Sequence, residues 1–131
     1  MIQVFIVDDH AIFREGLKRV INDAPDMEVI GEAADGHEAL QKIFTNHGDV
    51  VILDLGLPGM SGIDVLRAVK TKKPSIPVII LSIHTEEEYA FMVLKDGASG
   101  YMTKQSVPAD LLVGGQKATV DALRATGLPP R

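Results

Sequence analysis

The chain has 131 residues, of which 46% are hydrophobic and 24% charged; this predicts one folded globular domain and excludes a disordered or fibrous protein. Its net charge of −5 argues against a surface that tracks nucleic-acid backbones, and the absence of cysteine excludes disulfide scaffolds and thiolate metal sites. No segment offers the roughly 20 apolar residues of a membrane span, and no secretion signal is seen, so we expect a cytoplasmic protein without membrane contact.

The first half of the chain alternates aliphatic runs with amphipathic stretches. Residues 2–7 and 27–33 predict strands, and residues 50–53 form a continuous aliphatic run typical of a central strand covered on both faces. Residues 12–22 and 37–44 predict helices because their apolar residues recur at helical spacing. The positions expected to face the core are Phe13, Leu17, Val20, Ile21, Ala39, Leu40, Ile43 and Phe44.

The second half continues the same alternation. Residues 62–72 predict a helix that Ser61 caps, and residues 78–82 predict the fourth strand. A fourth helix begins near Thr85, whose hydroxyl can cap free amides, and residues 99–103 predict a short fifth strand.

Five such alternations predict an α/β fold of the doubly wound (βα)5, flavodoxin-like type. Right-handed crossovers favour a five-stranded parallel sheet in the order 2-1-3-4-5, which places the first and third strands side by side. Ligands of such sheets bind at the carboxyl ends of the strands.

Three aspartates follow the first and third predicted strands directly. Asp8 and Asp9 follow residues 2–7, and Asp54 follows residues 50–53. If these strands are neighbours the carboxylates converge, and their repulsion is relieved by a hard divalent cation held through oxygen. The sequence therefore predicts a Mg²⁺-dependent phosphoryl site.

Over residues 1–113 the chain resembles the receiver domains of two-component response regulators, and more narrowly their NarL/FixJ-type subgroup. The motifs that carry the resemblance occur in the family's order and spacing: Asp8-Asp9-His10, the DLGLPGMSG segment at residues 54–62, Leu81-Ser82, the GASGY segment at residues 97–101, and Lys104. The remaining residues, 114–131, are expected to form an atypical and partly helical tail without a DNA-binding domain.

The resemblance implies that Asp54 is the nucleophile that accepts a phosphoryl group from a sensor histidine kinase. It implies that Asp9, Asp54 and the backbone carbonyl of Gly56 bind Mg²⁺ directly, and that Asp8 reaches the ion through water. Such a protein is not a classical enzyme, although it catalyses its own phosphorylation and slow dephosphorylation.

The resemblance also assigns a switch. Lys104 is expected to contact the phosphoryl oxygens, and Ser82 to donate a hydrogen bond to the same group. Tyr101 is expected to follow Ser82 inward, which reshapes the surface made by the fourth helix, fifth strand and fifth helix. The implied output is transcription in a full-length regulator, with DNA contacted only through a domain absent from this chain; a homodimer is left open.

Each part also has an ordinary structural explanation. An Asp pair before a helix is usually a cap, Ser82 alone is an ordinary strand end, and Tyr101 alone fits edge-strand packing. The chain's histidines, His10, His37, His47 and His84, lack metal-ligand spacing, and a surface or capping role is favoured for all of them.

Two departures from the family's pattern stand out. Ile83 is bulkier than the small residue many receivers carry there, and Gly56 offers no side chain beside the phosphoryl group, so the phosphoryl lifetime is expected to differ. A fifth helix that begins at Pro108 is interrupted by Gly114-Gly115, each costing about 1 kcal/mol relative to alanine.

Two other functions need residues that this chain lacks. A haloacid-dehalogenase-type phosphatase needs an acid two residues after the nucleophile, where this chain has Gly56. A flavodoxin-like nucleotide binder needs a first loop rich in free amides, whereas this one carries two acids. A stand-alone receiver, a truncated transcription factor and a phosphate-independent pseudo-receiver stay open, as do the cognate kinase, signal, target genes and oligomeric surface.

Overall fold

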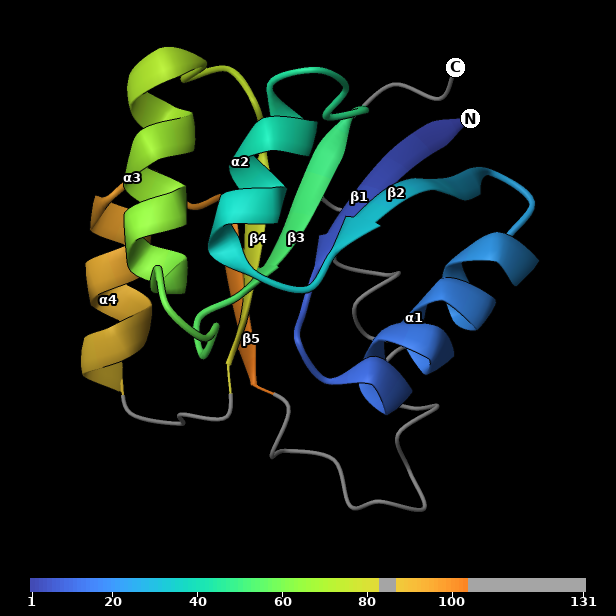
Figure 1. The fold of residues 1–131 in the computed structure, drawn as a ribbon, viewed down its shortest axis with the longest axis horizontal. Helices are drawn as coiled ribbons and strands as arrows, with labels where there is room; N and C mark the ends of the chain where they lie inside the picture. Colours follow the sequence, from blue (N-terminus) through green and yellow to red (C-terminus); the bar gives the residue numbers. More distant parts are fainter. Residues whose placement is uncertain (83–86, 104–131) are drawn as a thin grey trace.

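A computed structural model of the chain describes residues 1–82 and 87–103. Its centre is a five-stranded sheet in the order β2-β1-β3-β4-β5, and all neighbouring strands are parallel (Figure 1). The predicted fold class and strand order are therefore confirmed. The expectations that fall outside the described residues concern Ile83, His84, Thr85, Lys104, the helix from Pro108 and the tail 114–131.

Strands and helices alternate along the chain as the hydrophobic pattern predicts, and the predicted bounds differ only at element ends. The strands are β1 (Ile2–Val7), β2 (Met27–Ala33), β3 (Val50–Asp54), β4 (Val78–Ser82) and β5 (Gly100–Thr103). The helices are α1 (Ala11–Asp23), α2 (Gly36–Ile43), α3 (Gly62–Lys72) and α4 (Glu87–Lys95). No helix in the described part of the chain is long and apolar enough to cross a membrane.

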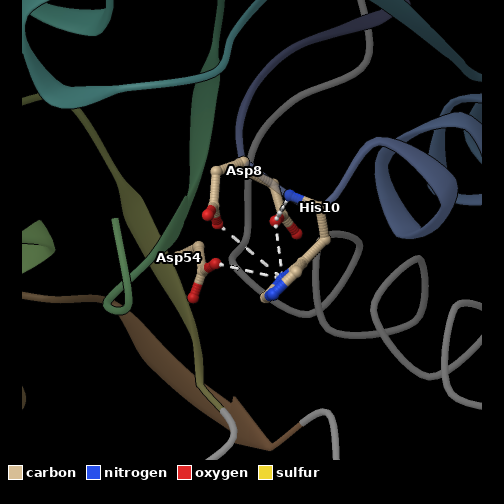
Figure 2. Close-up of side chains that lie close together, drawn as sticks. Asp8, His10 and Asp54 are labelled. Atoms are coloured by element: carbon tan, nitrogen blue, oxygen red, sulfur yellow. Dashed lines mark hydrogen bonds and ion pairs between the residues drawn. The ribbon is translucent and has the colours of Figure 1, made fainter. Parts of the chain in front are cut away.

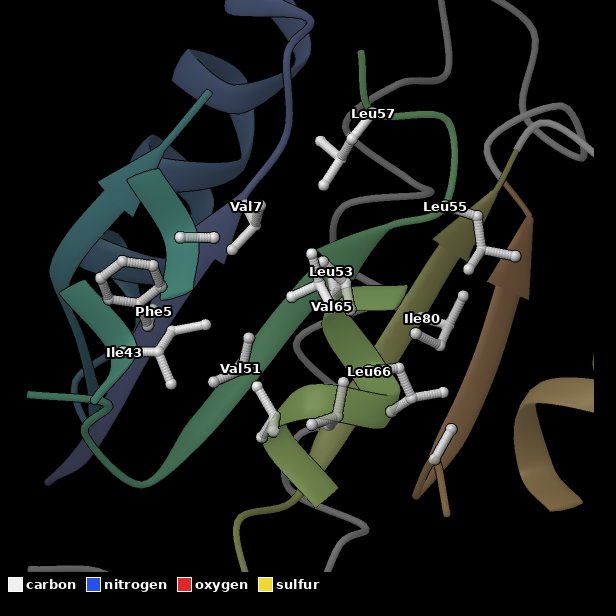
Figure 3. Packing of buried hydrophobic residues seen from close by; sticks show 14 of the residues in the cluster. Phe5, Val7, Ile43, Val51, Leu53, Leu55, Leu57, Val65, Leu66 and Ile80 are labelled. Carbon is white, nitrogen blue, oxygen red and sulfur yellow. The ribbon is translucent and has the colours of Figure 1, made fainter. Parts of the chain in front are cut away.

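The sheet separates two layers of hydrophobic packing. Because successive side chains of a strand point to opposite faces, Val4 and Ile6 pack with α1, whereas Phe5 and Val7 pack with α2 and α3. Figure 3 shows the second layer, where Val51, Leu53 and Ile80 lie beneath α3. The core-facing residues predicted for α1 and α2 are all buried or packed against these clusters.

Polar residues fix the starts of two helices. Asp35 accepts a hydrogen bond from the Glu38 amide at 2.8 Å, and Ser61 accepts one from the Asp64 amide at 3.2 Å. Ser61 is the predicted cap, whereas the predicted Asp35-Gly36 turn is itself the start of α2. The negative charge of Asp35 also interacts favourably with the positive end of α2.

The strand register brings the carboxyl ends of three strands together. Val7 of β1 pairs with Leu53 of β3. Asp8 and Asp54 are the next residues in sequence after these two, so they lie beside each other. Asp54 in turn pairs with Leu81, which places Ser82 at the same edge of the sheet. The fold thus collects the sequence-predicted residues of β1, β3 and β4 at one corner.

Candidate functional site

Strand geometry sets the direction of two buried carboxylates. Asp8 continues the alternation of Val4 and Ile6, and Asp54 continues that of Val50 and Ile52, so both lie on the α1 side of the sheet. Asp8 is only 1% exposed and Asp54 only 2%. Buried acids are costly unless other groups compensate their charge, so this corner is a functional candidate.

The turn between β1 and α1 adds two more polar side chains to these carboxylates. The backbone amide of His10 donates a hydrogen bond to Asp8 Oδ1 at 2.8 Å. His10 Nδ1 lies 3.3 Å from Asp8 Oδ1 and 3.7 Å from Asp54 Oδ2 (Figure 2). It lies 3.8 Å from Asp9 Oδ1. One ligating atom from each of the four residues lies within 4.8 Å of the others. We call Asp8, Asp9, His10 and Asp54 the acid site.

The donor set of the acid site fits a divalent cation. Three carboxylates held this closely repel one another when ionised, and a bound cation relieves that repulsion. Carboxylate oxygens are the ligands of hard ions such as Mg²⁺, and the exposed position of Asp9 leaves room for the waters that this ion retains. The residues present could therefore hold Mg²⁺.

The loop after β3 fixes the orientation of Asp54. Gly56 N–H donates to Asp54 Oδ1 at 3.0 Å, which leaves Oδ2 on the side of His10. Leu55 and Leu57 are both buried in the hydrophobic cluster and anchor the loop on either side of Gly56 (Figure 3). The Leu55 amide also donates to the Leu81 carbonyl at 3.0 Å, which ties the loop to β4.

Gly62, at the start of α3, packs against the backbone beneath Asp54. A Cβ at this position would lie 2.4 Å from the Asp54 carbonyl oxygen and 2.5 Å from Leu55 Cα. Neither is a flexible side-chain end, so a larger residue would displace the backbone that carries the nucleophile candidate. Glycine is required here by close packing.

A second group of charges lies beside the acid site. Arg14 Nη1 donates to the Asp8 carbonyl oxygen, and its Nε lies 3.2 Å from Glu32 Oε1. Lys18 Nζ lies 2.5 Å from Glu32 and 2.8 Å from Glu15. We call Arg14, Glu15, Lys18 and Glu32 the paired cluster. Because Arg14 also holds the Asp8 carbonyl, this cluster supports the turn that carries the acids.

Ion pairing shifts the pKa values of Lys18 and Glu32 in the paired cluster. The hydrogen bond from Lys18, together with the nearby Lys18 and Arg14 charges, lowers the pKa of Glu32 below its usual 4.5. Hydrogen bonds to Glu15 and Glu32 raise the pKa of Lys18 above its usual 10.5. Both shifts favour the charged forms, as expected for satisfied ion pairs.

The remaining predicted residues that the structure describes lie at the same edge or near it. Ser82 is buried at the end of β4, in register with Thr103 of β5. Tyr101 pairs with Ile80 in the sheet and packs, partly buried, against the hydrophobic cluster. Gly56 lies in the loop directly after Asp54. Lys104 follows β5 and lies outside the described residues.

The structure adds His10 and Arg14 to the residues of this corner. The side chain of His10 is 55% exposed, as a surface position predicts, but it makes no capping hydrogen bond and lies close to the acids. Its position directly after Asp8-Asp9, at a strand end, is the signal that points to the site. The role of Arg14 was harder to predict, because its partner Glu32 is distant in sequence.

Known proteins share the sequence pattern and the fold of this chain. The family model for the response regulator receiver domain matches residues 4–114. The transcriptional regulatory protein DegU of Brevibacillus brevis is 39% identical over 112 residues, which are 86% of this chain and 47% of DegU. The chain thus spans about half the length of this relative.

Solved structures show the same architecture. The signal receiver domain of NarL from Mycobacterium tuberculosis is 34% identical with a TM-score of 0.79, over 94% of this chain and 96% of that one. A chain of the CheX–CheY–BeF₃–Mg²⁺ complex from Borrelia burgdorferi is 26% identical with a TM-score of 0.83, over 98% of this chain and 90% of that one.

Proposed function

Because the chain belongs to the response regulator receiver domain family, with relatives of the NarL and DegU type, we propose that it is a phosphorylation-dependent switch in which Asp54 accepts a phosphoryl group from a sensor histidine kinase. The observation that carries the proposal is the buried Asp54 carboxylate, held with Asp8 and Asp9 within one ligand sphere at the end of β3. Proteins of this family are signalling proteins rather than classical enzymes.

In the transfer step, a carboxylate oxygen of Asp54 attacks the phosphorus of a phosphohistidine on the kinase. A new O–P bond forms while the N–P bond breaks, and its electron pair stays on the kinase imidazole. The chain contributes mainly position, because the Gly56 amide and the anchored loop hold the carboxylate still.

Asp9, Asp54 and the Gly56 carbonyl would hold Mg²⁺ directly, and Asp8 would reach it through water. Mg²⁺ when bound neutralises charge on the phosphoryl oxygens. The support is the chemistry of the donor set, three carboxylates with ligating oxygens within 4.8 Å. The exposed position of Gly56 is compatible with its proposed backbone contact.

The switch is proposed to run from Ser82 and Lys104 to Tyr101. Lys104 and the Ser82 hydroxyl would bind the phosphoryl oxygens, and Tyr101 would then repack. Support comes from Tyr101, which is partly buried on β5 beside α4, and from Phe91 and Leu94, which are exposed on α4. An apolar surface next to a movable aromatic ring suits a partner that reads the phosphorylated state. The proposed output is transcription.

The kinase is proposed to dock on the start of α1. Ile12 is 85% exposed there, two residues from His10. An exposed aliphatic side chain beside the nucleophile would be buried by a partner that brings its phosphohistidine to Asp54. We also propose that this phosphotransfer takes place in the cytoplasm.

The test is phosphorylation of the purified chain by acetyl phosphate with Mg²⁺, followed by intact mass measurement. We expect one hydroxylamine-labile phosphoryl group that requires Mg²⁺ and is lost in Asp54→Asn. The matched control is Asp64→Asn, which removes an exposed carboxylate on α3 and leaves the labelling unchanged. Absence of labelling in the natural chain, or full labelling of Asp54→Asn, would overturn the proposal.

A further inference from the structure

We propose that His10 is a nitrogen ligand of the metal ion in the acid site, which raises the affinity of this site for imidazole-binding metals such as Ni²⁺ relative to Mg²⁺. The inference rests on the metal binding included in the proposed function and concerns a residue to which that proposal gives no role. The ligand class is a divalent transition metal ion that accepts mixed oxygen and nitrogen donors.

The distances of the imidazole from Asp9 and Asp54 are short enough for the three side chains to reach one ion. Neighbouring ligands of an octahedral ion bound at roughly 2.1 Å lie about 3.0 Å apart, and opposite ligands about 4.2 Å apart. The distances from His10 Nδ1 to Asp8, Asp9 and Asp54 are 3.3, 3.8 and 3.7 Å, between these limits. Figure 2 shows the ring turned toward Asp8 and Asp54.

The backbone of His10 is held from both sides. Its N–H donates to Asp8 Oδ1 at 2.8 Å, and its carbonyl accepts the Arg14 amide at 2.9 Å at the start of α1. The position of the ring therefore depends mainly on its own side-chain torsions. The side chain is 55% exposed, which leaves space for water ligands beside the acids.

The chemistry of the added donor determines the metal preference. Carboxylate, carbonyl and water oxygens suit Mg²⁺, whereas imidazole nitrogen suits Ni²⁺, Zn²⁺ and related ions. An oxygen-only site can also bind Ni²⁺, so the contribution of His10 appears in the ratio of the Ni²⁺ and Mg²⁺ affinities. Removing the ring should lower the affinity for Ni²⁺ and leave that for Mg²⁺ nearly unchanged.

The test uses the untagged chain with Mg²⁺, Ni²⁺ and Mn²⁺ as probes. Calorimetry gives the Ni²⁺ and Mg²⁺ affinities, and electron spin echo modulation of bound Mn²⁺ detects a directly coordinated nitrogen. The variant is His10→Ala, which removes no capping hydrogen bond from α1. The control is His37→Ala, because His37 is exposed on α2.

We expect a nitrogen coupling in the natural chain and in His37→Ala that disappears in His10→Ala, together with a fall of about tenfold in the ratio of Ni²⁺ to Mg²⁺ affinity. Metal binding without a nitrogen coupling would overturn the inference and leave the proposed function intact. An equal increase of the Ni²⁺ and Mg²⁺ affinities in His10→Ala would also overturn the inference. The imidazole would then act as a cation that competes with the metal for the acids. No binding of any of the three metals would overturn the inference and the magnesium part of the proposed function together.

Discussion

The acid site and the paired cluster lie side by side at the start of α1, yet they combine charges in opposite ways. In the paired cluster, Arg14 and Lys18 alternate with Glu15 and Glu32 at hydrogen-bonding distances of 2.5 to 3.2 Å. In the acid site, three carboxylates share one imidazole at 3.3 to 3.8 Å. The first is a set of satisfied ion pairs, whereas the second concentrates like charges.

This difference separates a structural role from a functional one. Satisfied pairs stabilise the fold modestly and need no further ligand. Clustered carboxylates repel one another and lower the stability of the folded state. Proteins tolerate this cost at sites where the carboxylates bind a cation or take part in a reaction. Arg14 joins the two regions, because it binds both Glu32 and the carbonyl of Asp8. We therefore expect substitutions in the two regions to differ in sign.

The largest effect is expected from Gly62→Ala, which tests whether the backbone beneath Asp54 is rigid. The new Cβ would meet the Asp54 carbonyl oxygen at 2.4 Å, so the free energy of unfolding should fall by about 3 kcal/mol. Urea denaturation measures this change. The control is Gly56→Ala, whose Cβ would lie 3.7 Å from Asp54 Oδ1 in ordinary contact. Equal stability of the two variants would show that the loop adjusts freely.

Asp9→Asn should remove most of the Mg²⁺ affinity. A lost direct ligand should weaken binding by at least about 100-fold, because even outer partners of a metal site contribute 10- to 100-fold. Calorimetric titration measures the affinity, and Asp23→Asn is the control because it removes an exposed acid at the end of α1. Similar affinities in the two variants would place the ion elsewhere.

Arg14→Gln should affect both regions at once. It removes charge-assisted hydrogen bonds to Glu32 and to the Asp8 carbonyl from a side chain that is 15% exposed, so the free energy of unfolding should fall by about 1.5 kcal/mol. Mg²⁺ affinity should fall about tenfold, as for an outer partner. The control is Arg19→Gln, an exposed position on the same helix. Loss of stability with full metal affinity would show that the two regions are independent.

Without metal, Asp9→Asn should raise the stability that Arg14→Gln lowers. Relief of carboxylate repulsion should increase the free energy of unfolding by about 0.5 to 1 kcal/mol in the presence of a chelator. The measurement is urea denaturation with and without Mg²⁺, and the gain should vanish or reverse when Mg²⁺ stabilises the natural chain. A destabilised metal-free Asp9→Asn variant would contradict the contrast between the two regions.

The smallest effect is a pH dependence of the paired cluster. Because pairing lowers the pKa of Glu32 below 4.5, its contribution is present above pH 4.5 and is lost as pH falls through its folded-state pKa. Glu32 is partly exposed, so this contribution should be below about 1 kcal/mol. The stability difference between the natural chain and Glu32→Gln should therefore shrink on acidification below pH 4.5. A difference that stays constant would show that Glu32 is not paired in solution.

The sequence alone predicted the sheet order and the meeting of Asp8, Asp9 and Asp54. These follow from continuous aliphatic strands and from the handedness of parallel crossovers, both of which are strong local signals. The end of β3 was harder to place, because Asp54 is polar yet pairs with Leu81 as a strand residue.

The direction of the His10 side chain and the contact between Arg14 and Glu32 could not be predicted in the same way. The direction of the imidazole depends on the path of a short turn, which no periodic pattern reports. Arg14 and Glu32 are far apart in sequence and meet only because α1 packs beside β2. Contacts of this kind depend on the assembled fold rather than on local preference.

Phosphorylation of Asp54 is tested by a crystal structure of the chain grown with Mg²⁺ and beryllofluoride, a phosphoryl mimic. We expect beryllium bonded to a carboxylate oxygen of Asp54, with Mg²⁺ bound by Asp9, Asp54 and the Gly56 carbonyl. A well-ordered structure with the Asp54 carboxylate unmodified and no ion between it and Asp9 would contradict it.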